Sequence, residues 1–235
     1  MIPDDLIQLI DNLISDALLR KSKCNQNILN IDGMCGITTR HLYNNICSIF
    51  NKPPKSDKDR SPYSYLEIGN SPNKKTDYSY LEIGCWKGAS TIASLYKNDL
   101  NATVIDNWSE FGGCKFDFVK NISKYLDNQI QIINQDCFSL KKDTVFDYSP
   151  YTFFLYDGPH QENDHLQSIV DFWKYLDNTC IIIIDDWNWI DVRNGTYRGL
   201  DSVNAKILHK WELFEPTTEN RHGLWNGCCI FLIQK

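Results

Sequence analysis

One segment, residues 80–91 (Tyr-Leu-Glu-Ile-Gly-Cys-Trp-Lys-Gly-Ala-Ser-Thr), restricts the possible fold more than any other. An apolar run ends at Ile83, a turn carries Gly84 and Gly88, and a helical pattern follows at 89–96. In doubly wound α/β folds, ligands bind beyond the carboxyl end of the first strand. Glycines remove side chains where a ligand approaches, and a helix N-terminus offers free N–H groups. We therefore expect a ligand site at this turn.

Further apolar runs follow, and most end in a carboxylate. They lie at 102–106, 130–136, 151–157 and 180–186, and helical patterns separate them at 116–126, 164–176 and 197–208. Strands that alternate with helices predict right-handed crossovers and a parallel sheet. Segments 211–214 and 228–233 fit a closing antiparallel hairpin. The predicted fold is α/β, a Rossmann-like doubly wound sheet of seven strands, mainly parallel with an antiparallel last strand.

The chain before this sheet divides into two parts. Residues 1–50 are predicted to form an N-terminal helical cap with helices at 3–20 and 38–49, and residues 51–77 a polar linker loop. The apolar face expected for the first helix carries Leu6, Ile7, Ile10, Leu13, Ile14, Leu18 and Leu19. Within the linker, Tyr63–Gly69 repeats Tyr78–Gly84 residue for residue. The first copy is either a duplicated loop or a competitor for one strand position.

Composition narrows the classes of partner. The formal net charge is −6, which argues against a nucleic-acid surface because phosphate contacts need clustered Lys and Arg. The nine cysteines include no C-x-x-C pair, and free cysteines suit a reducing cytoplasm. Asp4 and Asp5 stand where a signal peptide is basic, and no apolar run reaches membrane-spanning length. We expect a cytoplasmic protein that binds neither nucleic acid nor membrane.

The glycine spacing separates two cofactor classes. A dinucleotide fingerprint needs G-x-G-x-x-G, but Gly84 and Gly88 form G-x-x-x-G, and Glu82 precedes them. This arrangement resembles the first motif of class I S-adenosylmethionine (SAM) methyltransferases, and the resemblance covers residues 78–235. It implies that 78–235 is a SAM-binding methyltransferase domain. The implied cofactor-binding residues are Glu82, Gly84, Gly88, Asp106, Asn107, Trp108, Asp136, Cys137, Phe138 and Asp157.

Within that set, individual roles are expected. Glu82 would lie near the sulfonium of SAM, and Asp106, about 20 residues after the glycine turn, would bind the ribose hydroxyls. Asp136 would lie near the adenine, which Trp108 or Phe138 would flank. The alternative for Asp136 is a helix-capping carboxylate.

The acids after the fourth and fifth strands extend the resemblance to the metal-dependent O-methyltransferases of the catechol and caffeoyl-CoA type and the related sugar methyltransferases. By that match Asp157, Asp185 and Asp186 are metal ligands, for Mg²⁺, and Asp157 and His160 are catalytic. His160 stands where the catechol type carries its lysine base, and an imidazole with a pKa near ~6.5 suits that role. Alternatives are a metal-free acidic cluster, and a helix-capping role for His160.

The residues after the fifth strand are expected to line the acceptor pocket: Trp187, Asn188, Trp189 and Arg193. Their aromatic faces suit a sugar ring or a planar phenol. The predicted function is SAM-dependent O-methylation of a small-molecule or glycan acceptor such as a sugar or polyol, with a homodimer through the N-terminal helices. The alternatives are a non-catalytic SAM-binding protein and a dinucleotide-dependent oxidoreductase, which the missing third glycine and Trp86 in the turn disfavour.

Overall fold

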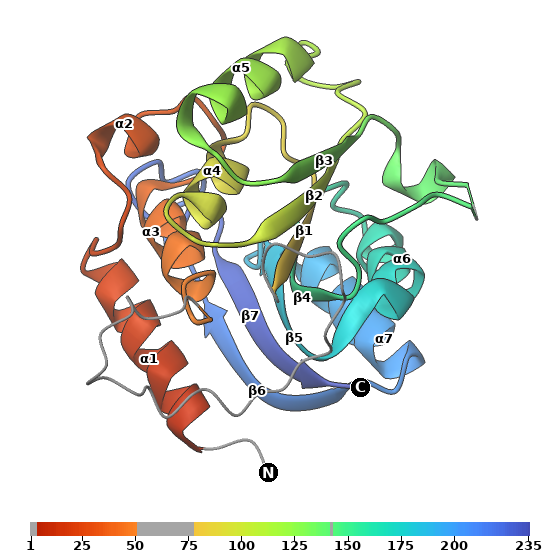
Figure 1. The fold of residues 1–235 in the computed structure, drawn as a ribbon. Helices are drawn as coiled ribbons and strands as arrows, with labels where there is room; N and C mark the ends of the chain where they lie inside the picture. The colour runs from red at the N-terminus through yellow and green to blue at the C-terminus, as the bar shows by residue number, and fades with distance from the viewer. Residues whose placement is uncertain (1–3, 51–77, 142) are drawn as a thin grey trace, which may run out of the picture.

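The computed structural model describes residues 4–50, 78–141 and 143–235. The predicted linker at 51–77, with the first copy of the repeat, lies outside the described residues. Figure 1 shows the helices and strands in chain order. The helices are α1 (Asp4–Leu18), α2 (Gln26–Leu29), α3 (Ile37–Ile46), α4 (Ala89–Leu95), α5 (Lys115–Tyr125), α6 (Glu162–Phe172) and α7 (Ile190–Ser202), with 3-10 turns η1 (Cys137–Ser139) and η2 (Trp173–Tyr175). The strands are β1 (Ser79–Ile83), β2 (Asn101–Ile105), β3 (Ile130–Ile133), β4 (Tyr151–Tyr156), β5 (Leu176–Asp185), β6 (Lys206–Leu213) and β7 (Cys228–Gln234).

The strands form one sheet in the order β3-β2-β1-β4-β5-β7-β6. Strands β1 to β5 pair in parallel, whereas β7 is antiparallel to both of its neighbours, β5 and β6. The predicted seven-stranded, mainly parallel sheet is therefore confirmed. The chain runs outward from β1 to β3 and then returns to place β4 on the other side of β1. The strand order reverses between β1 and β4, which is where ligands bind in open α/β sheets.

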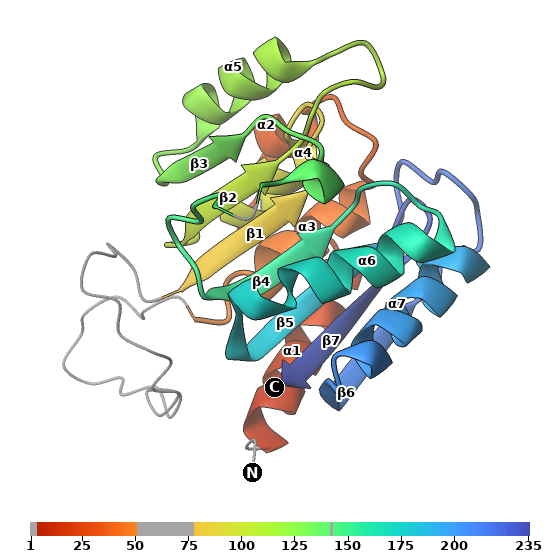
Figure 2. The same ribbon diagram turned by 90° about the vertical axis from the view of Figure 1, so that its right-hand side faces the viewer.

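Helices cover both faces of the sheet, as Figure 2 shows with α6 and α7 in front and α1 and α3 behind. The burial of β5 on both faces of the sheet explains why its sequence is continuously apolar. Ile181 and Ile183 pack in the core cluster on the α1–α5 side, and Ile182 and Ile184 pack in the cluster under α6 and α7. Successive side chains of a strand point to opposite faces, so a strand buried on both sides needs apolar residues at every position.

The N-terminal helices form a layer of the fold rather than only a cover for a site. Leu6, Ile10 and Ile14 of α1 are buried in the same core cluster as the sheet residues. The expectation that Leu18 and Leu19 share this apolar face is wrong, because they are 52% and 66% exposed. Among the described residues, no helix is both long and apolar enough to cross a membrane.

The predicted helix at 197–208 is displaced: α7 begins at Ile190 and ends at Ser202, and β6 begins at Lys206. Gly199 lies inside the predicted helix, and Gly195 lies just before it. In the structure they allow close packing on α6, since a Cβ at Gly195 would lie 2.1 Å from the Glu162 carbonyl oxygen. The predicted strand at 211–214 covers only the last part of β6, whose earlier residues are mostly exposed on an edge strand.

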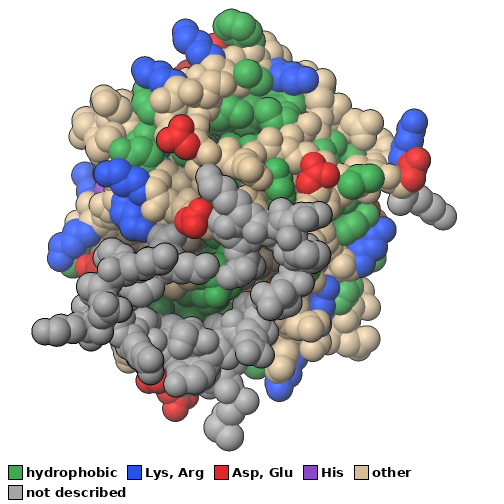
Figure 3. All heavy atoms as spheres, in the orientation of Figure 1, with side chains coloured by type: hydrophobic (Ala, Val, Ile, Leu, Met, Phe, Trp, Pro, Cys, Tyr) green, Lys and Arg blue, Asp and Glu red, His purple; other side chains and the backbone are tan. Residues whose placement is uncertain are grey.

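The charged side chains are distributed, not gathered, on the face seen in Figure 3. Lys and Arg side chains lie scattered around the periphery of that view.

Candidate active site

A cavity of about 390 Å³ opens at the carboxyl ends of the parallel strands, at the reversal point between β1 and β4. Each strand from β1 to β5 contributes the residues that follow it, and the N-terminal segment and the β6–β7 loop complete the wall. The lining comes from residues 33–35, 83–87, 89–90, 105–111, 135–137 and 157–160, together with Asp186, Trp189, Glu219, Trp225 and Asn226. The predicted ligand site at the glycine turn is therefore part of a larger cavity.

The two glycines of the turn lie against different residues, Gly84 against Asp157 and Gly88 against Phe118. Both have left-handed backbones, with φ of +82° at Gly84 and +86° at Gly88, a conformation that favours glycine. Gly84 lines the cavity, and a Cβ there would lie 1.9 Å from the carbonyl oxygen of Asp157. A Cβ at Gly88 would instead meet the Phe118 ring at 3.0 Å, and Gly88 is not part of the lining. Gly84 thus lets β1 and β4 end close together.

Asp106, at the end of β2, joins two turns at the cavity wall. Its Oδ2 accepts the backbone N–H groups of Cys85 at 3.0 Å and Trp86 at 2.8 Å, and its Oδ1 accepts that of Trp108 at 2.6 Å. A carboxylate that accepts three N–H groups is fixed in place before any ligand arrives. Its neighbour Asn107 also lines the cavity.

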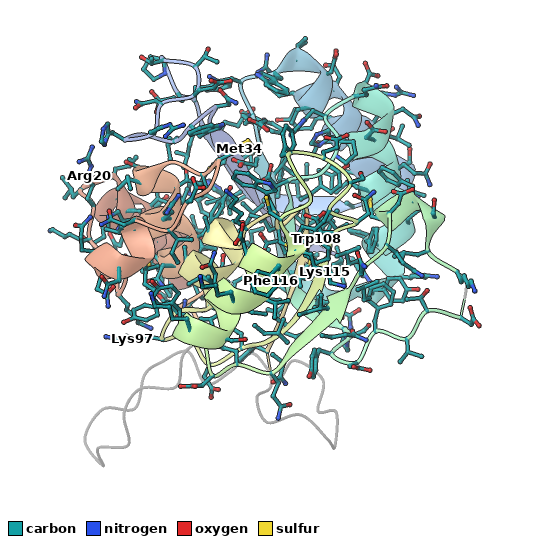
Figure 4. All side chains as sticks on the ribbon, turned by 90° about the horizontal axis from the view of Figure 1, so that it is seen from above. Arg20, Met34, Lys97, Trp108, Lys115 and Phe116 are labelled. Atoms are coloured by element: carbon teal, nitrogen blue, oxygen red, sulfur yellow. The ribbon has the colours of Figure 1, made fainter. Side chains whose placement is uncertain are left out.

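Trp108 forms an aromatic wall beside this carboxylate. The ring is largely buried, lines the cavity, and donates its Nε1–H to the Trp86 carbonyl oxygen at 2.8 Å. The Nζ of Lys115 lies 5.5 Å from the ring centroid; both residues are labelled in Figure 4. Phe118 packs against the ring at 5.5 Å between centroids. The indole plane is therefore held by contacts from α5 and from the glycine turn.

The end of β3 supplies a third carboxylate. Asp136 caps the 3-10 turn η1, because it accepts the Phe138 N–H at 3.1 Å and the Ser139 hydroxyl at 2.6 Å, and it also lines the cavity. The capping alternative and the cavity position are both realised. Cys137 lines the cavity as well, but Phe138 does not: it packs against the core cluster under α6 and α7.

Glu82 lies beneath the cavity, outside its lining. The side chain is fully buried and accepts the hydroxyls of Tyr80, at 3.0 Å, and of Ser90. Burial raises the pKa of Glu82 to about 7, although the hydroxyl donors act in the opposite direction. Ser90 lines the cavity, so Glu82 is connected to the cavity wall through its hydrogen bond with Ser90.

Three potential metal-ligating side chains meet on the β4–β5 side of the cavity. One ligand atom each from Asp157, His160 and Asp186 lies within 4.8 Å of the others. The Nε2 of His160 is 2.7 Å from Oδ2 of Asp186 and 3.9 Å from Oδ1 of Asp157. The side-chain amide of Asn226 donates to the other Asp186 oxygen at 2.6 Å. The cluster has the size of a site for one cation.

Electrostatics set the protonation of this cluster. Burial alone would lower the pKa of His160, but the adjacent carboxylates of Asp157 and Asp186 outweigh it and raise that pKa to about 10. Burial, together with the charge of Asp186, raises the pKa of Asp157 to about 6 against the opposing effect of His160. At neutral pH, without a cation, the imidazole is therefore protonated and paired.

Comparison with known proteins assigns the sheet and its cavity. Residues 81–187 match a family model described as a methyltransferase domain. The match runs from β1 through the loop after β5, so it spans the glycine turn and the acidic cluster. It favours a methyltransferase over the dinucleotide-dependent oxidoreductase. A search of curated proteins found no significant match.

Solved structures agree with this fold at low identity. An O-methyltransferase from Bacillus cereus in complex with SAH is 16% identical, with a TM-score of 0.50 over 67% of this chain and 74% of that one. A SAM-dependent methyltransferase from Streptococcus mutans is 14% identical, with a TM-score of 0.49 over 67% of this chain and 44% of that one. The O-methyltransferase TomG from Streptomyces achromogenes is 12% identical, with a TM-score of 0.49 over 67% of this chain and 73% of that one. The chain thus spans less than half of the Streptococcus mutans protein. The Bacillus cereus structure supports the fold of the methyltransferase domain.

Asp185 does not join the Asp157–His160–Asp186 cluster, contrary to the metal set expected from the sequence. It is the last residue of β5, is buried, and does not line the cavity. Burial raises its pKa well above the usual carboxyl range, and its Oδ1 has no hydrogen-bond partner among the described residues. Asp186 has a left-handed backbone, φ +53°, which turns it away from the strand and toward the cavity. His160 occupies the third place.

Of the four residues expected to line the acceptor pocket, only Trp189 does so. Trp187 is fully buried between Tyr197 and Phe231, with ring centroids 5.6 Å from each. The other two expected residues, Asn188 and Arg193, form hydrogen bonds with backbone groups instead of lining the cavity. The Asn188 amide pairs with the backbone of Glu215, and Arg193 donates to the carbonyl oxygens of Trp187 and Asn188, at 2.7 Å each. These three residues brace the loop that carries Trp189.

The sequence gave little warning of two other parts of the wall. One is the loop Gly33–Cys35, held by the buried guanidinium of Arg40, which donates to the carbonyl oxygens of Leu29, Ile31 and Cys35 at 2.6–3.0 Å. The other is the β6–β7 loop with Glu219, Trp225 and Asn226. The tryptophan in the turn at 225–227 was the signal available in the sequence, whereas the burial of Arg40 is a property of the fold.

Proposed function

We propose that this chain is a SAM-dependent methyltransferase that methylates a hydroxyl oxygen of a small acceptor such as a sugar or polyol, assisted by a divalent cation. One observation carries the proposal: the Asp157–His160–Asp186 cluster faces the same cavity as the glycine turn and Asp106. A methyl donor and a hydroxyl acceptor can therefore meet in one enclosed space. The Bacillus cereus O-methyltransferase of similar fold, in complex with SAH, supports this choice of cofactor.

The β1–β3 side of the cavity suits SAM. Asp106 retains acceptor capacity for ribose hydroxyls, since a carboxylate offers about four lone-pair sites and three are engaged. The Trp108 face offers a flat apolar surface for the adenine, near Asp136. Alignment of the sulfonium methyl with the acceptor oxygen is the main task of the protein, and alignment alone can supply ~7–11 kcal/mol.

The β4–β5 side suits a cation. The two carboxylates, Asp157 and Asp186, offer oxygen donors compatible with Mg²⁺ or Mn²⁺, and the His160 imidazole lies beside them, within 4.8 Å. When bound, such a cation lowers the pKa of a hydroxyl and orients its oxygen. Compensating the charges of Asp157 and Asp186 also removes the cause that raises the His160 pKa. The imidazole then returns toward the range in which it can accept the hydroxyl proton.

The direct test is calorimetric titration of the purified chain with SAM, S-adenosylhomocysteine and NAD⁺, with and without Mg²⁺. We expect the two sulfur cofactors to bind and NAD⁺ not to bind. A methyl-transfer assay with hydroxylated acceptors then follows, with EDTA to remove the cation. Binding of NAD⁺ alone would contradict the cofactor assignment, and transfer that is unchanged in EDTA would contradict the role of the cation.

A further inference from the structure

The charged residues that line the cavity are mostly acidic. The carboxylates are Asp106, Glu110, Asp136, Asp157, Asp186 and Glu219. Among the described residues, Lys87 is the only lysine or arginine in the lining, and its Nζ lies 2.6 Å from Oδ2 of Asp32. Its charge is thus already compensated by a carboxylate outside the lining. Among the described residues, the wall therefore offers no unpaired lysine or arginine to an anionic group on a ligand.

The carboxylates at the mouth differ from those deeper in the wall. Asp106 and Asp136 accept hydrogen bonds from neighbouring turns, and Asp186 pairs with His160. Glu110 and Glu219 are exposed, and neither forms an ion pair within the described part of the chain. They leave a negative potential at the entrance.

Glu219 is tied to the reacting end of the cavity. Its backbone N–H donates to Oδ1 of Asn226 at 2.9 Å, and the Nδ2 of the same amide donates to Asp186 at 2.6 Å. A single buried asparagine thus links the rim glutamate to the candidate cation cluster. Trp225, next to this amide, also lines the cavity, while Arg221 packs 6.0 Å from its ring and does not line it.

We propose that this cavity selects against anionic acceptors, with Glu219 as a specificity-determining residue, and that the acceptor is an uncharged or amine-bearing polyhydroxylated molecule. This inference rests on the proposed function and names its substrate class. A phosphate or carboxylate on the acceptor would be desolvated beside Glu219 without a guanidinium or ammonium to pair with it. The apolar faces of Trp189 and Trp225 accommodate a sugar ring without requiring charge.

The experiment measures methyl transfer from labelled SAM, with Mg²⁺, to hexose scaffolds that each come in four matched forms: neutral glycoside, amino sugar, uronate and sugar phosphate. We expect kcat/KM for the neutral or amino form to exceed that for the uronate and phosphate of the same scaffold by at least about tenfold. Glu219→Gln removes one charge and keeps the side-chain size. In this variant we expect the ratio of kcat/KM for the neutral or amino form to kcat/KM for the anionic forms to decrease severalfold. The control Asp201→Asn removes one exposed charge on α7, outside the cavity lining, and should leave the ratio unchanged.

The outcomes separate the two proposals. Transfer that favours the uronate or the phosphate, or a ratio that is the same in Glu219→Gln and the parent enzyme, would overturn the charge selection and leave the methyltransferase intact. A chain that binds SAM but methylates none of the scaffolds would overturn the proposed hydroxyl acceptor itself. The inference about charge would then fall with it.

Discussion

The two sides of the cavity are built in different ways. On the β1–β3 side, Asp106 and Asp136 accept N–H groups from turns that follow or adjoin their own strands. On the β4–β5 side, Asp186 depends on His160, 26 residues earlier, and on Asn226, 40 residues later. The first side is held mainly by backbone N–H groups of the turns after β1, β2 and β3, and the second by side chains from distant segments.

This difference has an electrostatic consequence. The carboxylates of the β1–β3 side are satisfied mainly by backbone N–H groups, whereas Asp157 and Asp186 share one imidazole, and the charge of Asp186 contributes to the raised pKa of Asp157. Like charges held close together favour the binding of a cation. The carboxylates of the β1–β3 side are therefore fixed before a ligand binds. Those of the β4–β5 side, Asp157 and Asp186, would be stabilised by a bound cation.

The largest effect is expected from Asp157→Asn. The variant keeps the shape of the β4–β5 side but removes a charge from the candidate cation cluster. We expect kcat for methyl transfer to fall by about three orders of magnitude, within the range of lost metal or acid–base assistance. The affinity for S-adenosylhomocysteine, measured by calorimetry, should change little. Equal losses of cofactor affinity and of transfer would contradict the division of the cavity into two sides.

A substitution on the β1–β3 side should instead weaken the binding of the cofactor. Asp106→Ala leaves the N–H groups of Cys85, Trp86 and Trp108 without their acceptor. Each unsatisfied buried donor costs about 1–3 kcal/mol, so we expect both a lower free energy of unfolding and a cofactor affinity reduced by roughly a hundredfold. Calorimetry and urea unfolding measure the two effects. An unchanged free energy of unfolding would show that water replaces the carboxylate.

A smaller effect is expected where the two distant loops meet. Asn226→Ala removes the amide that donates to Asp186 and accepts from Glu219. Because a hydrogen bond to a charged group contributes about 1.5–3 kcal/mol, we expect kcat/KM for transfer to fall by roughly tenfold or more. Asn188→Ala, on the outer side of the same loops, is a matched control for loop packing. If both variants lose transfer equally, the contact with Asp186 has no special role.

The smallest effect concerns stability against pH in the absence of a cation. The pKa of His160 is raised to about 10 in the folded chain, above the unfolded value near ~6.5. Its ion pair therefore stabilises the fold fully below about pH 6.5, and this contribution is lost as the pH rises toward 10. Thermal unfolding in EDTA should show a decline over that window that is weaker in His160→Gln. Asp157, with a pKa raised to about 6, adds a decline between about pH 4 and 6.

Much of the fold followed from local patterns. Apolar runs separated by helical stretches predicted five parallel strands, and the closing hairpin predicted the antiparallel partner of β5. Boundaries were less secure where local signals conflicted. The helix predicted at 197–208 begins at Ile190 and ends at Ser202, and its glycines at 195 and 199 lie against α6, where a Cβ would clash.

For the site, the sequence by itself determined which strand ends carry carboxylates, because a strand's end and its alternation are local properties. It could not decide which of two adjacent acids faces the cavity. Asp186 does so because its backbone is left-handed, whereas Asp185 continues the strand and is buried. Likewise only the tertiary structure placed Glu82 beneath the cavity and brought Asn226 and Glu219 to it. Those positions depend on contacts between segments far apart in the chain, which no local periodicity records.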